Sequence, residues 1–188
     1  MWDITNSDTL VSADEAPATK KRKKSDASSS APSIPSYTPI RSLTGHNAAV
    51  TALAYPHPSA IYSGSMDHNI KQWDLVTGAC VNTWFGRQVV TSLDFSLESN
   101  VIGSGHHDKV IRIWDPRQQE KEAMKLQLKS HKGWVSGVKF HPTRAHQLAS
   151  CSYDHSVKIW DMRASLPLFT LQAHTDKALA LDWMDESV

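Results

Sequence analysis

The chain has 188 residues, of which 40% are apolar and 21% charged, so it can bury one sizeable core. Its 20 Lys and Arg residues nearly balance its 19 Asp and Glu residues, which argues against a surface built wholly for nucleic acid. Because no apolar run approaches the ~18 residues that span a bilayer and no signal peptide follows Met1, we expect no membrane partner.

The first part of the chain, residues 5–38, differs in composition from the rest. It contains Pro17, Pro32 and Pro35, many Ser residues and few apolar ones. Such a segment cannot bury enough apolar surface to offset the entropy lost on ordering. We therefore expect a disordered loop, rich in basic, Ser and Pro residues, inserted before a strand at about residues 39–43.

Within this loop lie five consecutive cations, Lys20, Lys21, Arg22, Lys23 and Lys24. One interpretation is a solvated loop without further function. The alternatives are a nuclear-import signal and a patch that contacts rRNA, because mobile cations beside Ser and Pro are accessible to a receptor or to phosphate. Replacing all five and imaging the protein would test the import interpretation.

Three later segments, residues 63–74, 104–115 and 150–161, align without gaps. In each, a Ser lies four positions before an Asp, and that Asp lies six positions before a Trp-Asp pair. His46, His131 and His174 lie upstream of such segments or of their expected continuation, with His131 and His174 separated by 43 positions. A period of about 40–45 with these signatures is typical of WD repeats, in which each repeat forms four strands of a propeller blade.

The hydrophobic pattern agrees with strands, because apolar residues alternate with polar ones at pairs such as Val138/Phe140 and Val157/Ile159. We expect an all-β fold, a WD-repeat β-propeller fragment with three complete four-stranded blades plus parts of two others. Residues 1–4 would end a preceding blade, and residues 39–188 would form blades that are incomplete at the C-terminus. Residues 181–183 would be a first strand with nothing after it. Since an open ring leaves two unpaired sheet edges, we expect a part of a longer protein.

The recurring His, Ser and Asp residues suggest a catalytic triad, but an active site is built once and this set recurs at fixed spacing. In WD repeats the same residue types form a buried hydrogen-bond network together with the Trp indole. By this resemblance we expect a structural role and no enzyme activity. The residues concerned are His46, Ser63, Asp67 and Trp73, then Ser104, Asp108 and Trp114, then His131, Ser150, Asp154 and Trp160.

The middle set departs from this pattern, because its loop His position falls near Gly86. Ser104, Asp108 and Trp114 are therefore expected to lack the loop His as a partner. It follows that Asp154→Ala should destabilise the fold more than Asp108→Ala.

Two further clusters are candidate ligand sites. His106, His107 and Asp108 could bind a metal, but adjacent residues in a tight turn diverge, and neither they nor Cys80 and Cys151 complete a tetrahedral site. Residues 103–105 resemble part of a phosphate-binding loop, although no Gly-Lys-Ser/Thr follows them. We expect no metal and no cofactor.

The loops that enter the first strands and the turns that carry the Asp residues should crowd one face of the propeller. An exposed Trp beside cations would be a plausible partner-binding hot spot there. The alternative is a Trp packed against its neighbouring blade. The candidate residues are Met66, His107, Trp134, Tyr153 and Lys177.

The stretches 114–117, 130–135 and 161–177 are more specific than a generic WD repeat. They resemble the eukaryotic ribosome-biogenesis WD-repeat proteins that work with pescadillo and the block-of-proliferation protein. The resemblance implies a non-enzymatic scaffold on pre-60S particles, in maturation of the 28S and 5.8S rRNA, located in the nucleolus and nucleoplasm. In that family a separate ubiquitin-like domain binds midasin, so that partner cannot be assigned to residues of this chain.

A second function remains open. Arg117 and Arg163 complete Trp-Asp-x-Arg motifs, which match those of substrate receptors of cullin-4 ubiquitin ligases. The motif is short and Arg is common after Trp-Asp, so the signal is weak. Substituting both arginines should abolish adaptor binding under this hypothesis and spare pre-ribosome association under the first.

Overall fold

A computed structural model of the chain describes residues 40–118 and 123–184. The expectations for residues 1–4 and 5–38, including the run from Lys20 to Lys24, lie outside these residues. The described part is all β, as predicted, and it contains no helix long and apolar enough to cross a membrane.

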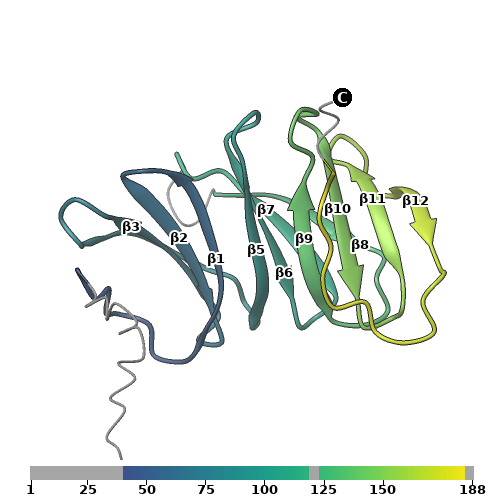
Figure 1. The fold of residues 1–188 in the computed structure, drawn as a ribbon, viewed down its shortest axis with the longest axis horizontal. Helices are drawn as coiled ribbons and strands as arrows, with labels where there is room; N and C mark the ends of the chain where they lie inside the picture. The colour runs from purple at the N-terminus through teal and green to yellow at the C-terminus, as the bar shows by residue number, and fades with distance from the viewer. Residues whose placement is uncertain (1–39, 119–122, 185–188) are drawn as a thin grey trace, which may run out of the picture. The chain divides into compact units, whose positions relative to one another are not determined.

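The strands form three four-stranded antiparallel sheets in which each strand pairs with the next along the chain (Figure 1). This confirms the three predicted blades. The first blade comprises β1 (Val50–His57), β2 (Ala60–Ser65), β3 (Asn69–Asp74) and β4 (Cys80–Phe85). The second comprises β5 (Val90–Ser96), β6 (Val101–His106), β7 (Val110–Trp114) and β8 (Met124–Lys129). The third comprises β9 (Val135–Phe140), β10 (Gln147–Ser152), β11 (Val157–Asp161) and β12 (Pro167–Leu171).

The turn between the second and third strands of each blade has the same backbone geometry. His68, Lys109 and His155 occupy it with φ of 71°, 70° and 67°, in the left-handed region. The preceding Asp tightens the turn, as when Asp67 Oδ1 accepts a hydrogen bond from the Asn69 N–H at 2.9 Å. An Asp that accepts a hydrogen bond from the N–H two residues on therefore fixes the same turn in all three blades.

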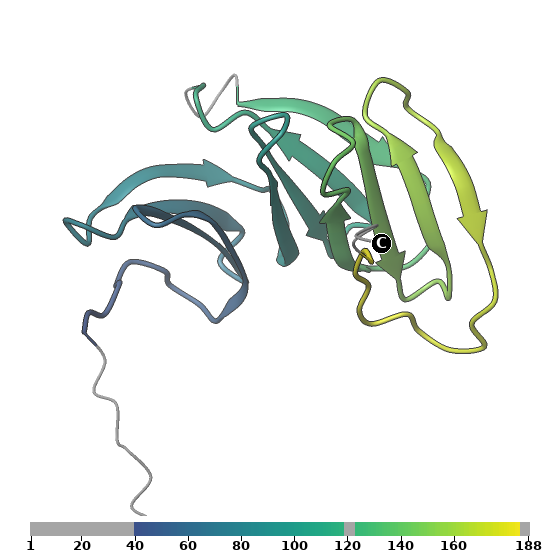
Figure 2. The same ribbon diagram turned by 45° about the horizontal axis from the view of Figure 1, so that its top comes forward.

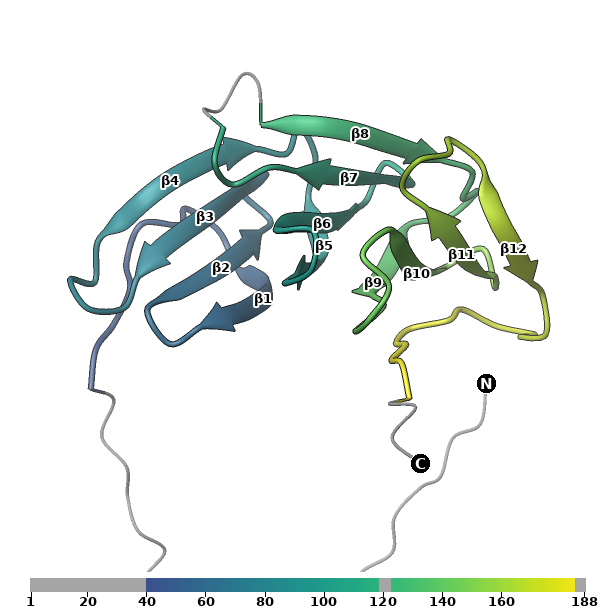
Figure 3. The ribbon, with the colours of Figure 1, turned by 90° about the horizontal axis from the view of Figure 1, so that it is seen from above.

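The blades pack side by side, with β1, β5 and β9 as inner strands and β4, β8 and β12 as outer strands (Figures 2 and 3). One apolar core lies between the first and second blades and includes Tyr62, Trp84 and Trp114. A second core lies between the second and third blades and includes Phe140 and Trp160. Each core is thus shared by two sheets, so burial of apolar area holds neighbouring blades together.

The chain after β12 returns toward β9 (Figure 3). The Ala178 carbonyl accepts a hydrogen bond from Ser136 Oγ, and Trp183 Nε1 donates to the Lys139 carbonyl at 3.1 Å. This segment therefore follows β9 as β9 follows β5, but residues 181–183 form no strand. The prediction of a strand there was wrong because a strand requires a hydrogen-bonded partner, and no described residue supplies one.

Candidate functional site

In the first blade the predicted network is complete. His46 Nδ1 lies 2.8 Å from Asp67 Oδ2, and His46 Nε2 lies 2.6 Å from Ser63 Oγ. Since a carboxylate only accepts, Nδ1 donates to Asp67; and since the Ser63 oxygen accepts from Trp73, the Ser63 hydroxyl donates to Nε2. Trp73 Nε1 donates to the same Ser63 oxygen at 2.8 Å. The network ties the entry loop, β2 and β3 together.

The third blade repeats the arrangement with nearly equal distances. His131 Nδ1 lies 3.0 Å from Asp154 Oδ2, and His131 Nε2 lies 2.7 Å from Ser150 Oγ. Trp160 Nε1 donates to Ser150 Oγ at 2.8 Å. Both complete sets that the resemblance to WD repeats implied are present in the structure.

The Asp of each set also holds backbone groups of the entry loop. Asp67 Oδ2 accepts from the Asn47 N–H at 2.9 Å, and Asp154 Oδ2 accepts from the Lys132 N–H at 2.7 Å. Burial raises the pKa of Asp67, but the hydrogen bonds from Asn47 and His46 outweigh it and lower the pKa to about 2. The same balance of burial against hydrogen bonds holds the pKa of Asp154 well below its usual range. Both carboxylates are therefore ionised acceptors at neutral pH.

The middle blade uses a different His. The loop position is Gly86, as expected, but His106 of β6 lies with its Nε2 2.8 Å from Ser104 Oγ. Its Nδ1 donates to the Gln88 carbonyl at 3.2 Å, and Trp114 Nε1 donates to Ser104 Oγ at 2.7 Å. The loop His is therefore absent, as expected, but sequence reasoning missed that His106 takes its place. A Cβ on Gly86 would lie 2.8 Å from His106 Cε1, so the missing side chain makes room for His106.

Asp108 has its own partner as well. Its two carboxylate oxygens accept from Arg112 Nη1 and Nη2 at 3.0 and 2.6 Å. Burial raises the pKa of Asp108, but the Arg112 contacts outweigh it and leave the pKa lowered. Arg112 is itself buried, and its Nε has no hydrogen-bond partner. Asp108 therefore has a partner to lose, so the reason for expecting Asp108→Ala to destabilise the fold less than Asp154→Ala no longer holds.

These contacts give the Ser, His and Asp side chains a structural role, because each is held in hydrogen bonds within the blade. Ser63, Ser104 and Ser150 are all buried. Each Ser oxygen accepts a hydrogen bond from an indole N–H, and its hydroxyl donates to a His nitrogen, so it is not available to a substrate. In three successive blades the arrangement links the entry loop with the second and third strands, which is the role that the resemblance to WD repeats implied.

The residues of the candidate metal and phosphate clusters also have structural roles. His106 is buried in the network, whereas His107 stacks on Trp134, so the adjacent side chains diverge as expected. Among the described residues no group of three His, Cys, Asp or Glu side chains could hold a metal ion. A Cβ on Gly103 or Gly105 would collide with Phe140 or Val135 at 2.9 and 2.7 Å, so these glycines serve blade packing.

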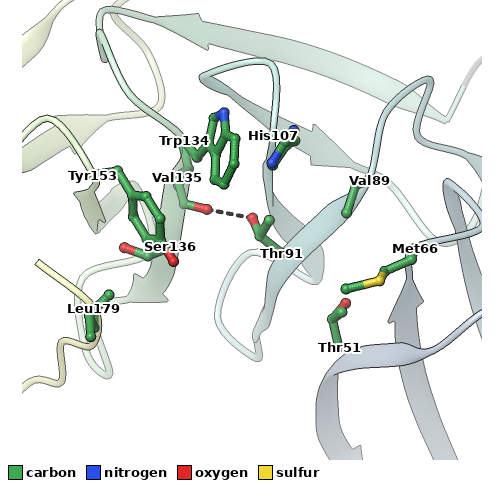
Figure 4. A pocket seen from close by; sticks show the side chains of 10 residues that line it. All are labelled: Thr51, Met66, Val89, Thr91, His107, Trp134, Val135, Ser136, Tyr153 and Leu179. Carbon is green, nitrogen blue, oxygen red and sulfur yellow. Dashed lines mark hydrogen bonds between the residues drawn. The ribbon is translucent and has the colours of Figure 1, made fainter. Parts of the chain in front are cut away.

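The structure gathers the predicted contact residues on one face (Figure 4). The ring centroids of His107 and Trp134 lie 3.4 Å apart, and those of Trp134 and Tyr153 lie 5.4 Å apart. Lys177 Nζ lies 5.0 Å from the centroid of Tyr153. Trp134 remains 43% exposed and Met66 51% exposed. Trp134 thus packs on a neighbouring blade and still presents aromatic surface, so both interpretations of this residue hold in part.

Beside this row lies a hollow of about 590 Å³. Its floor contains hydrogen bonds that sequence reasoning missed. The Thr51 and Thr91 hydroxyls donate to carbonyls of the next inner strand, and the Ser136 hydroxyl donates to the Ala178 carbonyl in the segment after β12. A hydroxyl at the second position of each inner strand was the available signal. The lining residues are Thr51, Met66, Val89, Thr91, His107, Trp134, Val135, Ser136, Tyr153 and Leu179.

The two Trp-Asp-x-Arg motifs form ion pairs within their own blades. Arg117 Nε lies 3.0 Å from Asp115 Oδ1, and Arg163 Nη2 lies 2.5 Å from Asp161 Oδ2. The hydrogen bonds from Arg163 lower the pKa of Asp161 to about 2. A local pairing within the turn therefore accounts for Arg at this position without an external partner.

Comparisons with known proteins agree with this architecture. Residues 37–74, 78–115 and 123–161 match the family described as "WD domain, G-beta repeat". The solved structure titled "Crystal structure of RRP9 WD40 repeats" superposes with a TM-score of 0.65 at 29% identity, over 73% of this chain and 42% of that one. The structure titled "Structure of U3-55K" gives a TM-score of 0.66 at 29% identity, over 73% and 43%.

Curated relatives share one description, "Ribosome biogenesis protein WDR12 homolog". The protein of Oryza sativa subsp. japonica is 35% identical over 184 residues, which cover 97% of this chain and 42% of the rice protein. The protein of Nematostella vectensis is 39% identical over 147 residues, which cover 78% of this chain and 35% of the relative. The chain thus spans less than half the length of these relatives.

Proposed function

Since the chain belongs to the WD40-repeat family, we propose that it is a non-catalytic protein-interaction scaffold in ribosome biogenesis. The observation that carries this proposal is that its reactive polar side chains and its exposed aromatic and cationic side chains lie in different places. The recurring polar residues that could do chemistry are buried in the networks, while aromatic and cationic side chains are exposed on one face. Such a face suits contact with a partner, and the description of the relatives supplies the process.

The finer proposal places the chain on pre-60S particles during maturation of the 28S and 5.8S rRNA, in the nucleolus and nucleoplasm. Pescadillo and the block-of-proliferation protein are the proposed partners. The motifs at 114–117, 130–135 and 161–177 support this assignment by their resemblance. Midasin is not proposed as a partner of these residues.

Affinity purification of the tagged protein from nuclear extract, followed by mass spectrometry, tests the proposal. We expect pescadillo, the block-of-proliferation protein and large-subunit ribosomal proteins. A matched control carries Gly137→Trp, which would collide with Cys151 in the third blade and disrupt it. Recovery of the cullin-4 adaptor without pre-ribosomal proteins would reject the proposal in favour of the ubiquitin-ligase function.

We also propose that the run from Lys20 to Lys24 serves nuclear import, because five consecutive cations present a dense positive charge to an import receptor. Replacing all five with Gln should move a fluorescent fusion from the nucleus to the cytoplasm. A control that replaces five surface cations of the blades with Gln should leave its location unchanged. Nuclear accumulation of the first variant would reject the import role.

A further inference from the structure

The contact face contains a continuous row of aromatic side chains, in which neighbouring rings are in contact and tilted by 33°. His107 comes from the turn after β6, Trp134 from the loop before β9, and Tyr153 from the turn after β10. Figure 4 shows Trp134 between the other two rings, with the hollow extending toward Met66. A row of π-faces beside an open hollow is a platform on which flat, unsaturated ligands stack.

The exposure of Trp134 does not come from a missing neighbour. Leu53 and Tyr55 on β1 and Phe169 and Leu171 on β12 are exposed because no described blade packs on those flanks. Trp134 instead lies at the junction of the second and third blades, where the shared core is complete. Its exposed surface therefore belongs to the face itself.

The exposed charges around the row are mainly positive. Lys109 lies two residues after His107, Lys132 two residues before Trp134, and Arg87 in the loop before β5. Together with Lys177 they make four exposed cations on this side. Among the described residues, the loops and turns of this side contain one exposed carboxylate, that of Asp176. The other carboxylates of these turns are taken by hydrogen bonds from within the blades, namely Asp67, Asp108 and Asp154.

We propose that this face binds single-stranded RNA, with an unpaired base stacked beside Trp134 in the hollow and phosphates held by Lys132 and Lys177. The hollow, about 590 Å³, falls within the range of small-ligand sites, about 300–1,000 Å³. Aromatic stacking combined with cations that follow a backbone is the pattern that recognises unpaired nucleotides. The inference rests on the proposed contact face and names its ligand.

Fluorescence anisotropy with a labelled 12-nucleotide single-stranded oligouridine and oligoadenosine tests the proposal. The full chain is used with Lys20, Lys21, Arg22, Lys23 and Lys24 changed to Gln, so that these cations cannot bind RNA themselves. In this background Trp134→Ala should weaken binding about ten-fold, as expected for one lost base stack. Lys132→Gln combined with Lys177→Gln should reduce the slope of log K against log salt by about 1.4, for two lost phosphate contacts.

Two controls separate binding from folding. Phe169→Ala removes an exposed aromatic ring on β12, away from the face, and should leave RNA affinity unchanged. Trp134→Phe keeps a stacking ring and should retain affinity within about three-fold, and thermal melts show whether each variant is folded.

The proposal is overturned if folded Trp134→Ala binds as tightly as the background chain. It is equally overturned if the background chain ignores RNA and binds a Glu-rich, Tyr-containing peptide through Trp134, since the face would then read acidic protein. In either case, retained recovery of pre-ribosomal proteins would leave the scaffold function standing, whereas loss of that recovery would reject both.

Discussion

The most informative perturbation is the removal of Asp108 from the middle blade. The sequence pattern ranks Asp108→Ala as milder than Asp154→Ala, but the contacts predict the reverse. Asp108 is the partner of the Arg112 guanidinium, and the Arg112 side chain is only 5% exposed. Without Asp108, a buried cation keeps its charge and loses its counter-ion.

The magnitudes follow from what each Asp leaves behind. Breaking a buried ion pair from one side costs about 3–5 kcal/mol, because the remaining charge is uncompensated. Asp154→Ala orphans His131, whose pKa burial lowers, so that group stays neutral. It also leaves two N–H groups without their acceptor, that of Lys132, which water reaches, and that of the buried Ser156. The Ser156 hydroxyl loses Asp154 as well but keeps His131 Nδ1 at 3.4 Å, so we expect about 2–3 kcal/mol.

Thermal melts followed by circular dichroism measure the difference. For a chain of this size 1 kcal/mol shifts Tm by about 2–4 °C, so Asp108→Ala should lower Tm by roughly 6–20 °C. The double variant Asp108→Ala with Arg112→Leu should recover most of that loss, because apolar replacement of a buried pair is often neutral. A double variant as unstable as Asp108→Ala alone would refute the reasoning, as would a greater loss in Asp154→Ala.

Four further outcomes are expected. Gly86→Ala should cost about 1–3 kcal/mol in urea melts, because its Cβ would meet His106 Cε1 at 2.8 Å. Burial holds the pKa of His106 at about 4 against 6.5 in the unfolded chain, so the unfolded state binds more protons between these values and stability falls as pH is lowered through them. Urea melts from pH 7 to 4 should show this loss, and His106→Gln should flatten it. Ser104→Ala and Ser150→Ala should lower Tm equally, since each leaves an indole N–H and a His nitrogen unpaired. Thr91→Val should cost about 1 kcal/mol by chemical denaturation, because it leaves a carbonyl of the next inner strand without its donor.

Fixed spacing made the blades predictable, and the resemblance to WD repeats made two of the three networks predictable. A Ser on the second strand, an Asp in the turn and a Trp on the third strand meet only when four and six positions separate them. His46 and His131 then complete the geometry from the entry loop. Because one network requires the same side chains at the same places, alignment of the repeats was sufficient.

The middle network was missed because its His lies on β6, whereas the His of the other two networks lies in the entry loop. His106 stands where the other blades have Ser65 and Ser152, and Gly86 stands where they have the loop His. The two changes compensate across 20 positions, since each is harmful without the other. Comparing both columns of the alignment together, rather than one at a time, would have shown the exchange.

The strand predicted at residues 181–183 failed for a different reason. Its alternating pattern is a local property, whereas a strand is a property of a pair. The same dependence on a neighbour explains Leu171, which is 54% exposed although Trp84 and Leu128, at the equivalent outer-strand positions, are 1% and 0% exposed. A sequence pattern predicts which residues can be buried, but the adjacent blade determines whether they are.

Repeat alignment predicts which positions form the contact face, but it does not predict how their side chains pack, because the face forms between repeats. Its members occupy positions that vary from blade to blade: Trp134 corresponds to Ala49 and Val89, and His107 corresponds to Met66 and Tyr153. The buried networks require constant residues, and the αL turns require a constant backbone, so variation is confined to side chains that the fold does not use. These side chains are held in place by turns that each network fixes. A repeat of this kind can therefore change what it binds without changing how it folds. In this chain the row from His107 to Tyr153 consists of such variable side chains, which is why we propose it as the binding site.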